Sequence, residues 1–243
     1  MTQIMLVIWR CPYCNASVST TDTLSSNTFW ADFYSDGKMV WSCMSDDDWL
    51  QICSECNKFI WKDEALESST TKTPPSNNAK YAELRYVNLK DYIRALDEAD
   101  ISNASKEYYI RMQIRWAFND RVRKGLWSVY DTFAVEQEKE IYEDNLKKLL
   151  KMNQDKQEKI GSIENVDERD EDEDEDDIDE LYIMQAEILR ELGQFNESIK
   201  ILNKTTNDNG WKNQLLNACQ EENQNIVKFG TEEIEEVNGL YRE

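Results

Sequence analysis

Two cysteine pairs carry the clearest chemical signal in this sequence, Cys11-Pro-Tyr-Cys14 and Cys53-Ser-Glu-Cys56. A gap of two residues lets both thiolates of one tight turn point at a single ion, while backbone N–H groups support the sulfurs. We therefore predict that Cys11, Cys14, Cys53 and Cys56 together hold one zinc ion. Four thiolates leave no open coordination position, so the predicted zinc is structural and not catalytic.

The same cysteines could also form a redox-active dithiol or an iron site. A redox-active dithiol would need a thioredoxin-like βαβ context, and a rubredoxin-like site would hold iron with the same four ligands. In a reducing compartment, paired cysteines at this spacing indicate metal ligands and not disulfides. We expect the other two cysteines, Cys43 and Cys219, to be free buried thiols rather than ligands.

An asparagine follows each cysteine pair, Asn15 after the first and Asn57 after the second. This position of a metal-binding turn usually needs a positive φ, and asparagine tolerates that conformation best after glycine. Two turns with the same chemistry strengthen the zinc prediction beyond a chance pair of motifs.

Short strand-like segments should present both cysteine turns. Residues 4–9 precede the first turn, and residues 58–61 follow the second. Between the pairs, residues 28–34 and 39–41 flank Ser35-Asp-Gly-Lys38, and Asp-Gly between such runs is a strong hairpin signal. The sequence thus predicts a β-hairpin between the cysteine pairs and a zinc ribbon over residues 1–61.

Composition excludes several classes of function. The 243 residues include no histidine, which removes Ser-His-Asp and Cys-His nucleophiles and histidine general bases. The formal net charge of −21 repels nucleic acid and anionic membranes at long range. No apolar run is long enough for a membrane span, and no signal peptide is evident, so we expect a cytoplasmic protein.

The remainder reads as helices joined by polar segments, which makes the predicted fold α+β and mostly α. Asn88 is a plausible N-cap for a first helix. A second helix should run from about 103 to 124 and a third from 136 to 152. The predicted segments after the ribbon are a linker (62–78), a helical region (79–153), an acidic disordered spacer (154–177), a second helical region (178–230) and an acidic tail (231–243).

The second helical region contains a helical hairpin, whose first helix should end at Gly193 as a left-handed C′ residue. The segment Ala186–Ile199 resembles the helix–turn–helix of a tetratricopeptide repeat, with Ser198 in place of the usual alanine. Together with the cysteine turns, Ser35–Lys38, Trp61 and Arg115–Arg121, it is similar to uncharacterised bacterial zinc-ribbon proteins. That resemblance implies a ribbon, a helical middle and a tetratricopeptide-like end, and it implies no particular activity.

We expect a non-enzymatic zinc-binding module that interacts with or regulates another protein. One alternative is a nucleic-acid-associated protein that uses the ribbon and the basic helix Arg111–Lys124, where Trp116 and Phe118 are interleaved. Another is an acidic inhibitor or immunity-type protein that mimics nucleic acid through the carboxylate-rich run Asp167–Glu180. Five tryptophans should cover the metal site and dock the ribbon onto the helices, or else form an exposed face for a partner: Trp9, Trp30, Trp41, Trp49 and Trp61.

Overall fold

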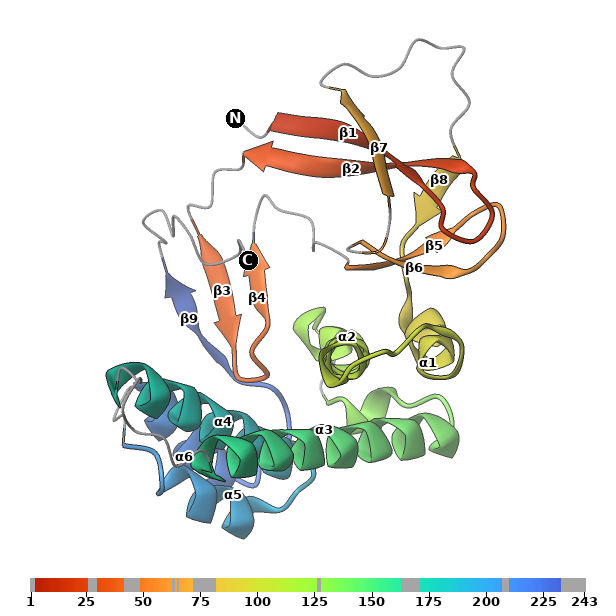
Figure 1. Cartoon of the computed structure of the whole chain (residues 1–243). Coiled ribbons are helices and arrows are strands. Elements are labelled where there is room, and N and C mark those ends of the chain that lie inside the picture. Colours follow the sequence, from red (N-terminus) through yellow and green to blue (C-terminus); the bar gives the residue numbers. More distant parts are fainter. Residues whose placement is uncertain are drawn as a thin grey trace. The chain divides into compact units, whose positions relative to one another are not determined.

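The fold is α+β and mostly helical, which confirms the predicted class (Figure 1). The chain divides into two compact units. Unit 1 comprises residues 1–31, 41–110 and 232–243, and unit 2 comprises residues 32–40 and 111–231. The computed structural model describes residues 3–25, 30–41, 49–62, 64, 66–71, 82–125, 128–162, 171–206 and 210–232.

Unit 1 contains a six-stranded sheet in the order β6-β5-β8-β2-β1-β7. The β1–β2, β1–β7, β5–β6 and β5–β8 pairs are antiparallel, whereas β2 and β8 are parallel. The strands are β1 (Gln3–Arg10), β2 (Ser17–Ser25), β5 (Leu50–Cys53), β6 (Phe59–Trp61), β7 (Leu66–Thr71) and β8 (Ala82–Arg85). Strand β8 lies inside the stretch that was predicted to be helical. Its four residues form a strand because they pair with neighbouring strands on both sides.

Helix α1 (Leu89–Glu98) belongs to unit 1 and begins where the sequence predicted. The Asn88 side chain accepts hydrogen bonds from the backbone N–H groups of Lys90 and Asp91, and Asp91 closes a capping box with the Asn88 N–H. Helix α2 (Ala104–Arg123) follows, and its residues up to Ile110 belong to unit 1.

An aromatic cluster joins the strands of unit 1 to the start of α2. The rings of Trp49 and Trp61 lie 5.0 Å apart, and both pack edge-on against Tyr109 at 5.4 and 5.9 Å. Trp61 also donates from Nε1 to the carbonyl oxygen of Asp100 at 2.8 Å. The predicted docking role is therefore confirmed for these two tryptophans, whereas the Trp30 side chain is 50% exposed.

Unit 2 contains a three-stranded sheet in the order β4-β3-β9 and most of the helices. Its elements are β3 (Ala31–Tyr34), β4 (Met39–Trp41), the short 3-10 helix η1 (Tyr130–Thr132), α3 (Glu136–Ser162), α4 (Glu171–Glu191), α5 (Phe195–Leu202), α6 (Gly210–Gln220) and β9 (Lys228–Glu232). No helix in the described part of the chain has both the length and the apolar character that crossing a bilayer requires.

The predicted hairpin around Ser35–Lys38 forms, but it does not belong to the unit that carries the cysteines. Gly37 has φ +78°, and the Tyr34 N–H donates to the Lys38 carbonyl oxygen at 3.1 Å. The turn packs against the later part of α2, where Trp116 Nε1 donates to the Asp36 carbonyl oxygen at 3.0 Å. Residues 1–61 therefore do not form one contiguous ribbon domain. The sequence could not predict this, because local turn chemistry indicates a hairpin but does not indicate which part of the chain the hairpin packs against.

The α4–α5 turn follows the sequence prediction closely. Gly193 has φ +74°, its N–H donates to Arg190 O at 2.9 Å, and the Gln194 N–H donates to Leu189 O at 2.8 Å. This pair of bonds is a Schellman motif. Ser198, which stands where a tetratricopeptide repeat usually has alanine, is buried. Its hydroxyl donates a hydrogen bond to Ala186 O at 2.7 Å, so the buried polar group has a partner.

Two predicted boundaries were wrong. The spacer predicted over 154–177 overlaps helices on both sides, since α3 continues to Ser162 and α4 begins at Glu171; residues 163–170 lie outside the described residues. The helical region predicted to reach residue 230 ends with α6 at Gln220, and Phe229 lies in β9, where its ring stacks on Trp211 at 5.1 Å. Most of the predicted acidic tail also lies outside the described residues.

Candidate metal centre

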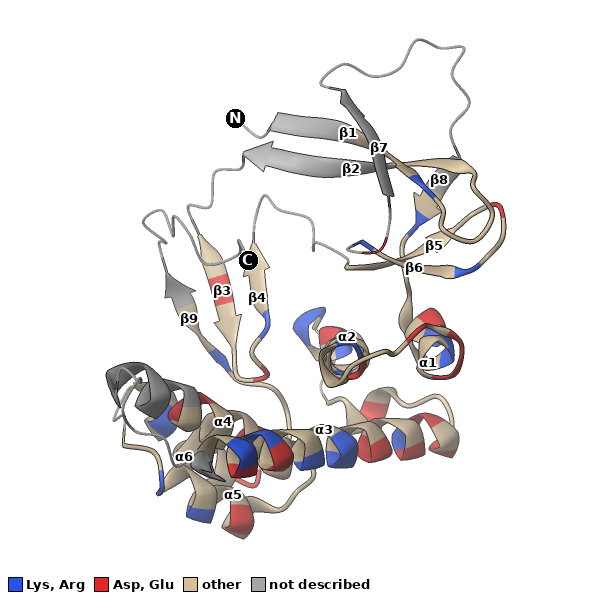
Figure 2. Ribbon diagram, viewed as in Figure 1, with Lys and Arg blue, Asp and Glu red and all other residues tan. Residues whose placement is uncertain are grey.

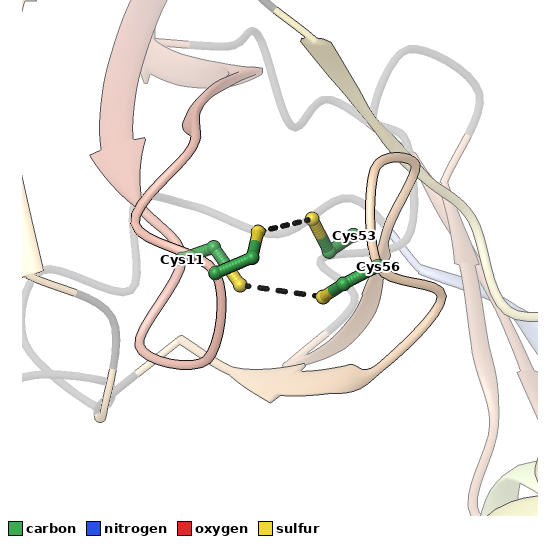
Figure 3. A group of neighbouring side chains, drawn as sticks. Cys11, Cys53 and Cys56 are labelled. Atoms are coloured by element: carbon green, nitrogen blue, oxygen red, sulfur yellow. Dashed lines mark hydrogen bonds between the residues drawn. The ribbon is translucent and has the colours of Figure 1, made fainter.

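Two β-turns of unit 1 bring the four predicted cysteines together. Cys11 and Cys14 lie in the turn between β1 and β2, whereas Cys53 is the last residue of β5 and Cys56 lies in the turn that leads to β6. All four Sγ atoms lie within 4.8 Å of one another. Figure 3 shows the two turns facing each other across the sulfurs.

The sulfur separations fit a tetrahedral metal site. The Cys11 and Cys56 Sγ atoms are 3.7 Å apart, and those of Cys14 and Cys53 are 3.8 Å apart. A tetrahedron with metal–sulfur bonds of about 2.3 Å has edges of about 3.8 Å. A disulfide would bring two sulfurs to about 2.05 Å. The four cysteines are thus close enough to coordinate one metal ion.

The two turns repeat the same backbone geometry. Asn15 and Asn57 have φ values of 63° and 57°, which confirms the predicted left-handed conformation. Asn15 N–H donates to Cys11 O at 3.0 Å, and Asn57 N–H donates to Cys53 O at 2.8 Å. Because asparagine reaches positive φ at lower cost than most residues, each turn can fold back and point its two sulfurs the same way.

Backbone N–H groups and burial shift the pKa values of the cysteine thiols in opposite directions. The Ala16 N–H donates to Cys14 and lowers the pKa of that thiol. Burial raises the pKa of the Cys11 thiol and raises the pKa of Cys56 to about 12. Since metals bind the thiolate form, loading this site would release protons.

Apolar residues shield three of the four cysteines. Cys11 and Cys53 are fully buried with Val18 and Ile60, and Trp9 packs against the same cluster. Cys56 is partly buried, whereas Cys14 is exposed. Four cysteine ligands that are mostly buried are consistent with a structural metal site.

Among the described residues, Cys219 is not part of this group. Cys219 is buried in unit 2, where its Sγ donates to Ser198 Oγ at 3.2 Å. This agrees with the expected free buried thiol. Cys43 lies outside the described residues.

Sequence reasoning missed Arg85 as a neighbour of the metal centre. Its guanidinium contacts Asn57 Oδ1 at 3.4 Å and Asp91 Oδ2 at 2.7 Å. The nearest signal in the sequence was the capping box at Asn88, which fixes the position of Asp91 but does not reveal its arginine partner.

The basic segment Arg111–Lys124 is largely neutralised within unit 2, and acidic residues also accompany the basic residues along α3 (Figure 2). Phe118 is fully buried in the core. Arg111 donates to Asn145 Oδ1 at 3.5 Å. The carboxylate partners of the other arginines are Glu191 for Arg115, Glu138 for Arg121, and Asp36 and Asp120 for Arg123. Arg115, Arg121 and Arg123 therefore each pair with a carboxylate of the same chain, which neutralises most of the charge of this segment.

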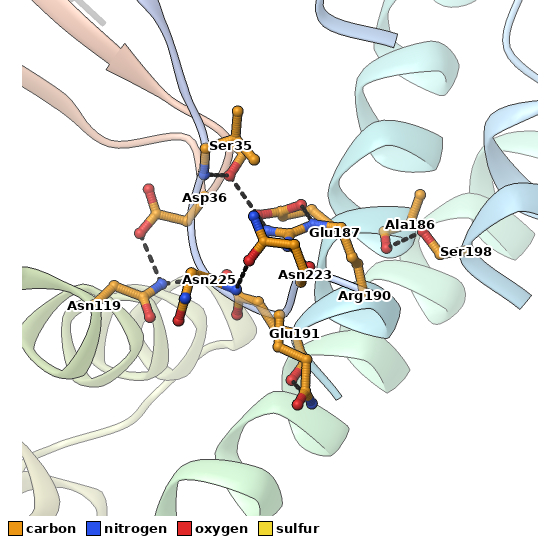
Figure 4. A network of polar contacts seen from close by, with 12 residues as sticks. Ser35, Asp36, Asn119, Ala186, Glu187, Arg190, Glu191, Ser198, Asn223 and Asn225 are labelled. Atoms are coloured by element: carbon orange, nitrogen blue, oxygen red, sulfur yellow. Dashed lines mark hydrogen bonds and ion pairs between the residues drawn. The ribbon is translucent and has the colours of Figure 1, made fainter. Parts of the chain in front are cut away.

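A buried polar network in unit 2 is the second group that sequence reasoning did not identify (Figure 4). Ser35 Oγ donates to Glu187 Oε1 at 2.5 Å, and Asn119 Nδ2 donates to Asp36 Oδ2 at 2.9 Å. Burial alone would raise the pKa of Asp36, but Arg123 and Arg115 outweigh burial and lower it. Acidic and basic groups are equal in number here: Asp36, Asp120, Glu187 and Glu191 against Lys38, Arg115, Arg123 and Arg190. Mutual neutralisation of this kind points to a structural role.

Comparison with protein-family models, curated proteins and solved structures gave no match.

Proposed function

We propose that this chain is a zinc-binding protein in which Cys11, Cys14, Cys53 and Cys56 hold one structural zinc ion. The observation that carries the proposal is the convergence of the four Sγ atoms within 4.8 Å, from two turns of matching backbone geometry. Soft thiolate ligands in a tetrahedral arrangement favour zinc or iron among the common metals. The two turns with their flanking strands β1, β2, β5 and β6 correspond to the zinc-bearing part of a ribbon.

Zinc is favoured over iron by the chemistry that the chain offers. A closed four-thiolate zinc site contributes folding energy and needs no redox partner. Iron would fit the same sulfur spacing, so the identity of the metal must be measured. Elemental analysis separates the two metals directly, and iron bound by four thiolates would also colour the protein.

We further propose a non-enzymatic role in which the folded chain interacts with or regulates another protein. Four thiolate ligands would leave the zinc ion no free position for a substrate. The α4–α5 hairpin, with its Schellman turn at Gly193, supports a tetratricopeptide-like helical region, and this architecture commonly presents binding surfaces. The pairing of Arg115, Arg121 and Arg123 with carboxylates weighs against nucleic acid as the partner.

Metal content is the decisive test of the zinc proposal. The wild-type protein, purified without added metal or chelator, should contain one zinc per chain by elemental analysis. Cys53→Ser should lose the metal, whereas Cys219→Ser should retain it, because Cys219 hydrogen-bonds to Ser198 in unit 2. Equal zinc content in both variants would refute the proposed ligand set, and stoichiometric iron in the wild type would replace zinc with iron.

A second measurement addresses the class of partner. Affinity purification from the native host, with and without nuclease, should recover the same proteins in both samples. Recovery that depends on intact nucleic acid would overturn the proposed protein-interaction role without affecting the zinc proposal.

A further inference from the structure

Arg85 occupies a special position beside the second cysteine turn. It is the last residue of β8, whose pairing with β5 places Arg85 opposite Ile52 and Leu84 opposite Cys53. Strand β5, which ends at Cys53, is therefore hydrogen-bonded to strand β8, which ends at Arg85.

The guanidinium of Arg85 bridges the cysteine turn and helix α1. Nη2 donates to Asn57 Oδ1 at 3.4 Å, and the two terminal nitrogens donate to the carboxylate of Asp91 at 2.7 and 3.4 Å. Asp91 is itself fixed, because it accepts a hydrogen bond from the Asn88 N–H at 3.4 Å in the capping box. An ordered helix N-terminus thus holds the arginine that contacts the turn.

Asn57 is the residue through which this contact can act on the metal ligands. It follows Cys56 directly, has φ 57° and closes the turn by donating to Cys53 O at 2.8 Å. A side chain that restrains Asn57 also restrains the direction of both sulfurs in the turn. In metal sites generally, mutating a group that orients a ligand typically lowers metal affinity or activity by about 10- to 100-fold.

The contacts of Arg85 are geometrically defined. A guanidinium is planar and forms bidentate contacts with a carboxylate, so the Asp91 carboxylate holds the Arg85 side chain beside the turn although that side chain is partly exposed.

We infer that Arg85 is a positioning residue of the metal centre, which raises metal affinity by restraining the Cys53–Cys56 turn through Asn57. The inference depends on the metal-binding function proposed above. It concerns a residue that lies outside the cysteine motifs and binds no metal itself.

Arg94 provides a matched control. It also donates to Asp91, at 3.5 Å, but it does so from α1, where it pairs with Glu98 at 2.8 Å. Its guanidinium lies over the ring of Phe59 at 4.5 Å. Arg85→Gln and Arg94→Gln each remove one arginine from the same carboxylate, but only Arg85→Gln removes the contact with Asn57.

Zinc affinity, measured by competition with a chromophoric chelator, tests the inference on the full chain. Arg85→Gln should weaken zinc binding about ten-fold, and Arg94→Gln should stay within about two-fold of wild type. Equal effects of the two substitutions, or no effect of Arg85→Gln, would overturn the inference. Failure of the wild type to bind zinc would instead overturn the proposed function, so the two failures are distinguishable.

Arg85→Lys keeps the inference testable if Arg85→Gln does not fold. Lysine retains the positive charge but lacks the planar fork that reaches Asn57 and Asp91 together. Zinc binding should therefore still weaken, by less than in Arg85→Gln. Wild-type zinc affinity in the Arg85→Lys protein would contradict the positioning role.

Discussion

Arg115 and Glu191 form a fully buried, bidentate ion pair. Nε of Arg115 donates to Oε2 of Glu191 at 3.0 Å, and Nη2 donates to Oε1 at the same distance. Neither residue has measurable exposure to solvent. The pair joins α2 to α4 within unit 2, and Tyr142 extends it by donating from its hydroxyl to Glu191 Oε2 at 3.2 Å. The integrity of unit 2 should therefore depend on keeping both charges together.

Arg115→Met should destabilise unit 2 strongly. The substitution leaves Glu191 buried beside Glu187 and Asp36 without its bidentate partner, and breaking a buried pair on one side typically costs about 3–5 kcal/mol. Urea unfolding followed by circular dichroism measures this loss. As a control, Lys200→Met removes the exposed pair with Glu197 and should change the stability by less than about 0.5 kcal/mol. Equal losses in the two variants would contradict a structural role for the buried pair.

Asp36 gives the stability of unit 2 a defined dependence on pH. The pKa of its carboxyl is lowered in the folded state, where the nearby Arg123 and Arg115 outweigh burial. As pH falls, the unfolded chain takes up the proton first, at about pH 4, so the stabilisation from Asp36 is complete above that pH and is lost as pH falls through the folded pKa. The gap in unfolding free energy between wild type and Asp36→Asn should therefore narrow as the pH falls below about 5.

Urea titrations of both proteins at a series of pH values provide the measurement. Thiol protonation and any loss of metal at low pH affect both proteins alike, so the gap isolates the carboxyl. A gap that stayed constant or widened on acidification would show that Asp36 is not held as a stabilised carboxylate.

Local signals in the sequence predicted local structure well. The N-cap at Asn88, the left-handed residues Asn15 and Asn57, the Ser35–Lys38 turn and the C′ glycine at 193 all have the predicted form. Each depends on a few neighbouring residues whose intrinsic preferences agree with the final fold. The four cysteines could be recognised for the same reason: the residues within each short turn determine where its two sulfurs point.

Long-range packing was not predictable in the same way. Nothing in the local pattern indicates that the hairpin turn packs on α2, or that Arg115 meets a carboxylate 76 positions later. Charge repulsion suggested disorder from residue 154 onward, but α3 continues because its later turns contact α4. Gln185 Nε2 donates to Gln157 Oε1 at 3.0 Å, and Lys151 pairs with Asp155 at 2.8 Å. These contacts stabilise helical backbone that composition alone would leave unfolded.

Asn15 should be replaceable by glycine but not by a β-branched residue. At φ 63° glycine pays no steric cost, whereas valine in the left-handed region costs about 1–3 kcal/mol. Asn15→Val should therefore lower the thermal midpoint of the metal-loaded protein clearly, and Asn15→Gly should stay close to wild type. Differential scanning calorimetry on matched samples tests this order. If the valine variant equalled the glycine variant, the first cysteine turn would not need the backbone conformation described here.

Trp61 connects the second cysteine turn to the helical part of unit 1, and its substitution should show how far the turn depends on that support. The side chain is fully buried, contacts Trp49 and Tyr109, and donates to Asp100 O at 2.8 Å. Trp61→Phe keeps an aromatic ring but loses the hydrogen bond to the carbonyl oxygen of the exposed Asp100, at a cost of about 0.5–1.5 kcal/mol. Trp61→Ala also opens a cavity and should cost about 3–5 kcal/mol. Chemical unfolding of the metal-loaded protein should rank the stabilities in the order wild type, Trp61→Phe, Trp61→Ala, from highest to lowest.

Trp30→Phe is the control and should change stability by less than about 0.5 kcal/mol, because half of that side chain is already exposed. If Trp61→Phe proved as mild as Trp30→Phe, the hydrogen bond to Asp100 would contribute nothing to the docking of the strands on the helices.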